Sequence, residues 1–317
     1  MDTLQKKQAS LIGAFVGDAA SLGFHWLYDA ERILSLAPET PEFRQPSEKD
    51  FADTKGYFAH GEKDAGDLTH YGAHLMSALK SIHENEGQWK VFSYQAQFRK
   101  DFERGGSFTG YIDGATRGTL DYLAAHDENP GLESGADDNQ ISGFAKVPAV
   151  VAVLAGHESM ATTVDEAIRV TNHNDEAVTY NLFAARVLEK VILGQSIHDA
   201  LYQSHDESPD FFDLKEEIGK ALAFQGTDPV ALGETFGTPC PVKNTIPLSV
   251  AILKHELSYV DAIRLNIHAG GDSAGRALFI GSVLAAAYGI GGEKGVPYHW
   301  LSEVFALDEI SQYLRSL

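Results

Sequence analysis

Apolar residues recur at helical spacing along almost the whole chain, and this periodicity most constrains the fold. In residues 8–27, the spacing of Leu11, Phe15 and Leu22 predicts an amphipathic helix. Almost no segment alternates apolar and polar residues as a half-buried strand does, and no repeat is visible. A chain of 317 residues is long enough to bury a sizeable core. We therefore expect one compact all-α domain spanning residues 1–317.

Polar residues gather where these helices are expected to start. They are Asp67, Thr69, Asp113, Asn172, His173 and Asp272. In a helical bundle several helix starts can meet, and their free backbone amides favour negatively charged groups. The sequence therefore predicts one cleft at which these starts converge.

The turn at residues 268–276 lies between two predicted helices. Gly270 and Gly271 interrupt the helical run and let the backbone approach another group closely. Asp272 follows at the position of an N-cap, where its carboxylate can accept hydrogen bonds from backbone amides. A carboxylate in this position is most often only a cap, but it can also serve as a metal ligand.

Two further spacings bring polar side chains onto one helical face. Asp18 and His25 are seven residues apart, close to two helical turns of about 3.6 residues each. His70 and His74 are four apart, a spacing that can share a metal, but no HExxH pattern accompanies them. Each pair also has an ordinary structural interpretation, and a dedicated zinc site would need a third ligand.

Composition excludes several classes of protein. A formal net charge of −20 and a pI near 4.9 argue against binding to a nucleic-acid backbone. The single cysteine, Cys240, excludes an internal disulfide. The first ten residues lack an apolar stretch, and residues 278–290 are too few to span a bilayer. We expect a cytoplasmic protein without a membrane segment.

Four motifs in a fixed order carry a resemblance to a known family. They are Gly13-Ala14-Phe15-Val16-Gly17-Asp18-Ala19, Gly66-Asp67-Leu68-Thr69, Thr171-Asn172-His173-Asn174 and Gly270-Gly271-Asp272. The last two each precede a helix rich in alanine. Together they resemble the ADP-ribosylglycohydrolase family over nearly the whole chain. The resemblance implies a compact all-α fold, and active members cleave ADP-ribose from protein side chains in a cleft with two magnesium ions.

This chain differs from active members of the family at positions where they carry metal-binding carboxylates. Active members usually carry Thr-Asp-Asp-Thr where this chain has Thr69-His70-Tyr71-Gly72. They carry a second aspartate where this chain has Ala274, and often a glutamate where it has His25. Since Mg²⁺ prefers hard oxygen ligands in octahedral geometry, we expect a weakened magnesium site. The pattern resembles a divergent branch that includes the J-crystallins.

The resemblance and the residue chemistry together give a set of candidate site residues. A neutral histidine near pH 7 can act as a general base, and carboxylates can orient a ribose or a cation. Arg276 either pairs with Asp272 or contacts a substrate phosphate. The candidate catalytic residues are His25, Asp67 and His70; the candidate ligand-binding residues are Asp18, Thr69, Tyr71, Asp113, Asn174, Ser273 and Arg276; the candidate metal ligand is Asp272, with Asp18 or Asp67.

Three functions remain compatible with these observations. The first is a hydrolase that cleaves a glycosidic bond of an ADP-ribosyl or related nucleoside-type substrate, with an altered metal site. The second is a nucleotide-binding protein that has lost hydrolysis. The third is a crystallin-like structural protein, which the acidic charge suits. The expected partner is a small molecule or an ADP-ribosylated substrate, and the sequence gives no indication of an oligomeric state.

Overall fold

The computed structural model describes residues 1–127 and 129–316, and helices follow one another through them. Extended backbone within these residues pairs only in isolated β-bridges. The predicted all-α fold is therefore confirmed. Glu128, and Leu317 at the end of the predicted domain, lie outside the described residues. In the described part of the chain, no helix is both long and apolar enough to cross a membrane.

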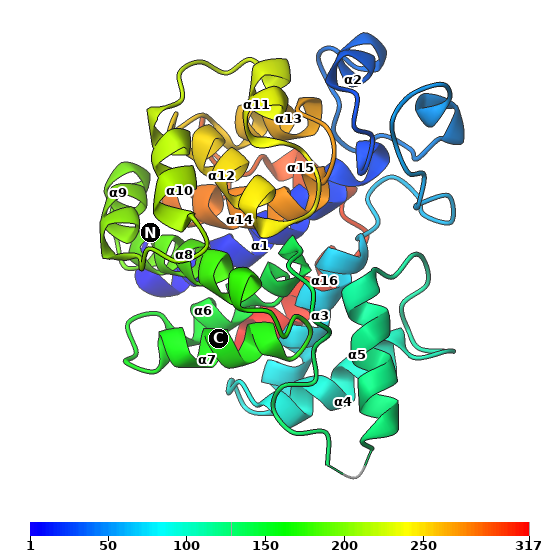
Figure 1. Cartoon of the computed structure of the whole chain (residues 1–317), viewed down its shortest axis with the longest axis vertical. Coiled ribbons are helices and arrows are strands. Elements are labelled where there is room, and N and C mark those ends of the chain that lie inside the picture. The colour runs from blue at the N-terminus through cyan, green and yellow to red at the C-terminus, as the bar shows by residue number, and fades with distance from the viewer. Residues whose placement is uncertain (128, 317) are drawn as a thin grey trace.

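The helices differ in length and lie in several orientations (Figure 1). In chain order they are α1 Thr3–Ser21, α2 Ala30–Leu36, α3 His70–Glu84, α4 Val91–Phe102, α5 Gly114–Ala125, α6 Val147–Leu154, α7 Met160–Arg169, α8 Asp175–Ile192, α9 Ile197–Glu207, α10 Leu214–Ala223, α11 Pro229–Phe236, α12 Val242–Leu253, α13 Tyr259–His268, α14 Ser273–Tyr288, α15 Tyr298–Glu303 and α16 Leu307–Tyr313. Short 3₁₀ turns include η1 Leu22–Phe24 and η3 Ile141–Phe144.

Helices α1 and α14 lie side by side through the middle of the molecule and share its most extensive helix contact (Figure 1). A Cβ atom on Gly13 would lie 2.3 Å from the carbonyl oxygen of Gly281 and 2.4 Å from the Cβ of Ala285. The backbones of the two helices therefore touch at this crossing, because glycine has no side chain to keep them apart. Tyr259 on α13 donates a hydrogen bond of 2.5 Å to the carbonyl oxygen of Gly13.

Helix α14 is buried on all sides, which explains why its sequence is apolar or small throughout. Residues 273–286 have almost no exposure, because α1, α8, α12 and α13 pack around the helix. The first turn of α14, with its capping Asp272, therefore opens into the interior rather than to the surface. Any polar group at this helix start must find its partners within the protein.

The helix crossing gives a direct stability prediction. Gly13→Ala should lower the free energy of unfolding by about 1–3 kcal/mol or more, because the added methyl group overlaps the Gly281 carbonyl. Gly219→Ala on α10 is the matched control, since its nearest neighbour would be 3.7 Å away. There the substitution should be neutral or stabilising by up to about 1 kcal/mol. Urea unfolding measures both, and equal effects at the two sites would contradict the proposed overlap.

Candidate functional site

The starts of α3, α5 and α14 meet in the interior, as the sequence predicts. Each helix is capped by a residue that was expected to do so, Thr69, Asp113 and Asp272 respectively. Their side chains accept backbone hydrogen bonds from Tyr71 at 3.1 Å, Thr116 at 2.8 Å and Gly275 at 3.1 Å. These caps satisfy free amides of the first turns and fix the positions of the polar groups beside them.

Asp272 lies at the centre of this region with no exposure to solvent. Its Oδ1 lies 3.1 Å from Nε2 of His25, and its Oδ2 accepts a hydrogen bond of 2.9 Å from the Tyr71 hydroxyl. Burial alone would raise the pKa of this carboxyl group. Hydrogen bonding and the charge interaction with His25, together with Arg276, instead hold the pKa of Asp272 at about 2.

His25 extends the hydrogen-bonded chain toward His60. Its Nδ1 lies 2.8 Å from Nε2 of His60, and both rings are buried. The ionised Asp272 accepts a hydrogen bond from Nε2–H of His25, and a second hydrogen bond joins Nδ1 of His25 to Nε2 of His60. Burial, followed by repulsion from His25 and His70, holds the pKa of His60 well below its ordinary value. Sequence reasoning missed His60, which lies in an irregular segment without periodicity.

Aromatic rings cover the cluster on its outer side. Trp26, only 5% exposed, lies 4.3 Å from the His25 ring and contacts Tyr111 edge to face at 5.0 Å. Tyr57 packs against both Trp26 and Tyr111. Trp26 has a left-handed backbone (φ 66°), and its amide donates to the carbonyl oxygen of Gly271. The region where we expected an open cleft is therefore filled by side chains.

Asp18 belongs to a neighbouring contact between α1 and the start of α3. It accepts hydrogen bonds from the backbone amide of Thr69 at 2.8 Å and from the Thr69 hydroxyl at 2.5 Å. Gly72 permits this approach, because a Cβ there would lie 2.3 Å from Oδ2 of Asp18. Burial raises the pKa of Asp18 to about 7, and the hydrogen bonds from Thr69 only partly oppose this effect.

His70 and Asp113 face each other without forming a hydrogen bond. Nε2 of His70 lies 3.8 Å from Oδ2 of Asp113, and neither His70 nitrogen has a hydrogen-bond partner among the described residues. Burial lowers the pKa of His70 to about 4 despite the nearby Asp113. His74 turns away and pairs with the Thr116 hydroxyl at 2.9 Å. The two histidines therefore do not share a ligand, and the zinc alternative gains no support.

Two of the predicted site residues lie apart from this cluster. Asp67 accepts a hydrogen bond from the amide of Asp64 and lines a separate pocket. Asn174 caps α8 and donates to Asp137 at 2.7 Å. Neither contacts the Asp272 cluster in the part of the chain that the structure describes. The expectation that all predicted helix starts converge is wrong for α8, since its start faces a different surface depression.

The remaining two candidates lie on the first turn of α14. Arg276 is buried and donates to Oδ1 of Asn266 at 2.7 Å and to the carbonyl oxygen of Gly270 at 2.6 Å. Of the two alternatives for Arg276, the ion pair with Asp272 is not formed among the described residues, because the side chain instead closes the Gly270 turn. Ser273 is also buried, and its hydroxyl has no described partner.

The donor set does not fit a binuclear magnesium centre. The carboxylate oxygens of Asp18 and Asp272 are already engaged by protein groups, and the two carboxylates serve different contacts. His70 and Tyr71 stand at the helix start between them, and Ala274 offers only a methyl group. Among the described residues, no group of three or more His, Cys, Asp or Glu side chains is arranged to hold a metal ion.

Comparisons with known proteins agree with the fold and with the resemblance to the J-crystallins. The family model described as ADP-ribosylglycohydrolase matches residues 1–317. Crystallin J1A of Tripedalia cystophora is 26% identical over 327 residues, covering 98% of this chain and 96% of the relative. Crystallin J1B of the same organism is 24% identical, with the same coverage. A solved structure of an ADP-ribosylglycohydrolase-related protein complex matches with a TM-score of 0.73 at 17% sequence identity. The match covers 99% of this chain and 97% of the chain in that structure, and it supports the fold alone.

The raised pKa of Asp18 predicts a specific pH dependence of stability. The ordinary pKa is 3.8 and the folded value is about 7, so the native state holds a proton that the unfolded state releases between these values. This stabilisation is complete below about pH 4 and declines as pH rises to about 7, by up to about 1.4 kcal/mol per pH unit. Asp18→Asn should remove this decline relative to the unmodified protein.

Urea unfolding at pH 4 to 8 measures the difference between the two proteins. Asp121→Asn, at an exposed position on α5, is the matched control and should follow the unmodified protein throughout. Parallel pH profiles for Asp18→Asn and the unmodified protein would show that Asp18 does not titrate in this range.

Because the donor set fits magnesium poorly, placing an aspartate at position 274 should destabilise the protein without creating a magnesium site. Ala274→Asp should lower the free energy of unfolding by roughly 3–5 kcal/mol, because it buries an unpaired charge. Ala274→Asn is the control for size and should be less destabilising. Millimolar Mg²⁺ should not restore the melting temperature of Ala274→Asp, since His70 and Tyr71 still occupy the opposing positions. Recovery with Mg²⁺ would contradict the account of the missing ligands.

Proposed function

The chain belongs to the ADP-ribosylglycohydrolase family, and we propose that it is a non-hydrolytic member whose cleft has become a hydrogen-bonded core. One observation carries this proposal: Asp272 is fully buried, and both of its oxygens are engaged by His25 and Tyr71. A carboxylate must reach a metal, a water or a substrate to assist glycoside hydrolysis. Here the carboxylate joins the start of α14 to two other segments instead.

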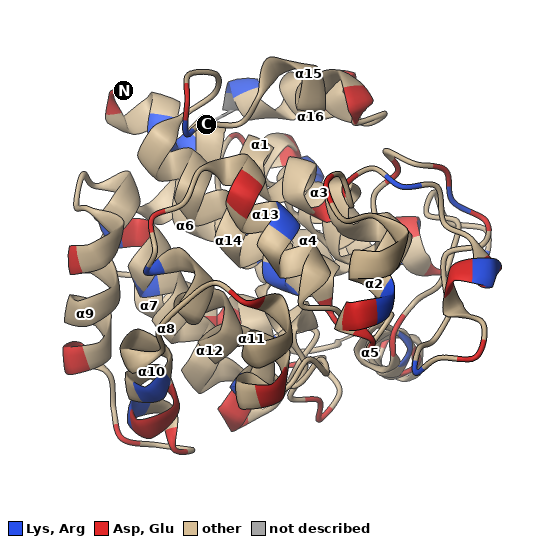
Figure 2. Cartoon of the chain, turned by 90° about the horizontal axis from the view of Figure 1, so that it is seen from above, with Lys and Arg blue, Asp and Glu red and all other residues tan. Residues whose placement is uncertain are grey.

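The proposed role is that of a stable, well-dispersed protein, as the name crystallin implies for its relatives. The chain carries 45 acidic and 25 basic residues, and their excess negative charge opposes association between copies. Acidic residues are spread over many helices and loops rather than gathered in one patch (Figure 2). Such a distribution supports solubility at high concentration more readily than steering of a single ligand.

A second candidate is a hydrolase that acts on an ADP-ribosyl or related nucleoside-type substrate without two magnesium ions. The observation that favours it is that both ring nitrogens of His70 and Oδ2 of Asp113 lack hydrogen-bond partners among the described residues, because buried polar atoms usually have such partners. A neutral His70 beside a carboxylate has the chemistry of a general base. In this alternative Trp26 and its neighbouring rings would have to move before a substrate reached His70.

An assay with ADP-ribosylated arginine and serine substrates separates the two candidates. We expect no turnover with or without Mg²⁺, and no change in melting temperature with Mg²⁺ or ADP-ribose, because a ligand of the native state must stabilise it. A magnesium-dependent family member serves as the positive control for each substrate.

Three other results would overturn the proposal in distinguishable ways. Turnover that is lost in His70→Gln would establish the hydrolase candidate. Turnover that needs Mg²⁺ would contradict the poor fit of the donor set. A higher melting temperature with ADP-ribose but no turnover would instead identify a nucleotide-binding protein.

A further inference from the structure

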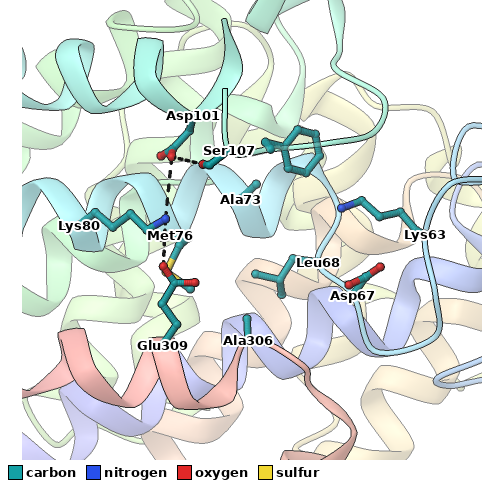
Figure 3. A pocket seen from close by; sticks show the side chains of 11 residues that line it. Lys63, Asp67, Leu68, Ala73, Met76, Lys80, Asp101, Ser107, Ala306 and Glu309 are labelled. Atoms are coloured by element: carbon teal, nitrogen blue, oxygen red, sulfur yellow. Dashed lines mark hydrogen bonds and ion pairs between the residues drawn. The ribbon is translucent and has the colours of Figure 1, made fainter. Parts of the chain in front are cut away.

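A second polar region lies outside the buried cluster, in a pocket between α3, α4, α16 and the loops before α3 and after α4. Its volume is about 170 Å³. Since one water occupies about 30 Å³ in the liquid, the pocket has room for a ligand of several heavy atoms. Charged side chains lie at its two ends, and apolar side chains lie between them (Figure 3).

The end formed by Lys80 is satisfied by the protein itself. Its ammonium lies 3.0 Å from Glu309 and 3.8 Å from Asp101. Asp101 also accepts hydrogen bonds from the hydroxyls of Ser77 and Ser107, at 2.6 Å and 2.5 Å. Lys80 is paired with both carboxylates, so this end has one excess negative charge and offers no free cation to a ligand.

The opposite end offers a free cation and a free carboxylate oxygen. The Lys63 ammonium lies 4.6 Å from the centre of the Phe108 ring, and it forms no ion pair with any described residue. Asp67 uses Oδ2 to accept a hydrogen bond of 2.9 Å from the amide of Asp64, which leaves Oδ1 available. Figure 3 places both groups at the same end of the pocket.

The middle of the pocket is apolar. Leu68, Ala73, Met76 and Ala306 supply side chains that lie between the two charged ends (Figure 3). The Phe108 ring also lines the pocket. Met76 is only 5% exposed, and its flexible thioether can adapt to ligands of different shape. An aliphatic or thioether group would be partly desolvated against these side chains.

The charged residues that line the pocket indicate which class of ligand it can bind. The lining contains two lysines and three acidic residues, so it has one more negative than positive charge. A simple carboxylate would meet a net repulsion, and a simple amine would leave Lys63 unused. A zwitterion uses Lys63 and Asp67 together and adds no net charge to a protein of charge −20.

We propose that this pocket binds a free amino acid with an apolar side chain, its carboxylate on Lys63 and its ammonium group on Asp67. The side chain extends along the apolar middle toward Met76. The inference does not depend on the proposed function, since neither the Lys63 ammonium nor the Asp67 carboxylate bonds to the Asp272 cluster; only the backbone amide of Lys63 does, by donating to the carbonyl oxygen of His60.

Calorimetric titration of the full chain with L-leucine and L-methionine tests the proposal. We expect saturable binding of at least one, and binding about tenfold or more weaker for 4-methylpentanoate, which lacks the amine, and for isopentylamine, which lacks the carboxylate. Absence of binding by both amino acids at millimolar concentration would overturn the proposal. Equal binding of either analogue would overturn the zwitterionic assignment.

Variants locate the binding in this pocket. Lys63→Met and Asp67→Asn should each weaken binding about tenfold or more, and Ala73→Leu should block the apolar middle while leaving both charges in place. Lys55→Met is the matched control, because Lys55 also lies over an aromatic ring, Tyr28, but outside the pocket. Unchanged affinity in Lys63→Met, or an equal loss in Lys55→Met, would place the ligand elsewhere. Melting temperatures without ligand verify that each variant is folded.

Discussion

The close crossing of α1 and α14 determines where the polar groups of this protein lie. Because Gly13 and Gly281 have no side chains, the two backbones touch, and α14 is buried along its length. Asp272 at the start of α14 and Asp18 near the end of α1 are therefore inside the protein. A buried carboxylate is costly unless protein groups hydrogen-bond to it. The arrangement around both aspartates follows from this requirement.

The two aspartates satisfy the requirement in different ways. Asp272 stays ionised, because His25, Tyr71 and the start of α14 all stabilise its charge. For Asp18, the effect of burial exceeds that of the hydrogen bonds from Thr69, and the pKa rises to about 7. In both cases hydrogen bonds from protein groups stabilise the buried carboxyl group. They also join the ends of α1, α3 and α14 to one another.

The sequence predicted the features that depend on local pattern. Helical periodicity and the absence of alternation predicted the all-α fold, and Thr69, Asp113 and Asp272 were correctly placed at helix starts. The sequence could not predict that side chains fill the expected cleft. Trp26 and His60 lie in or beside irregular segments, and their positions depend on tertiary contacts. The partners of Arg276 could not be predicted for the same reason, since Asn266 is brought close only by the Gly270 turn.

The contact between α1 and α14 also has a consequence during synthesis of the chain. Tyr259 and Gly13 are 246 residues apart, and His25 and Asp272 are 247 apart. Helix α1 therefore meets its main partner only after α13 and α14 have been synthesised. Until then its apolar face must pack against temporary neighbours, or against a chaperone. A fold with this topology should complete its core only after the more than 200 residues between the two helices have been made.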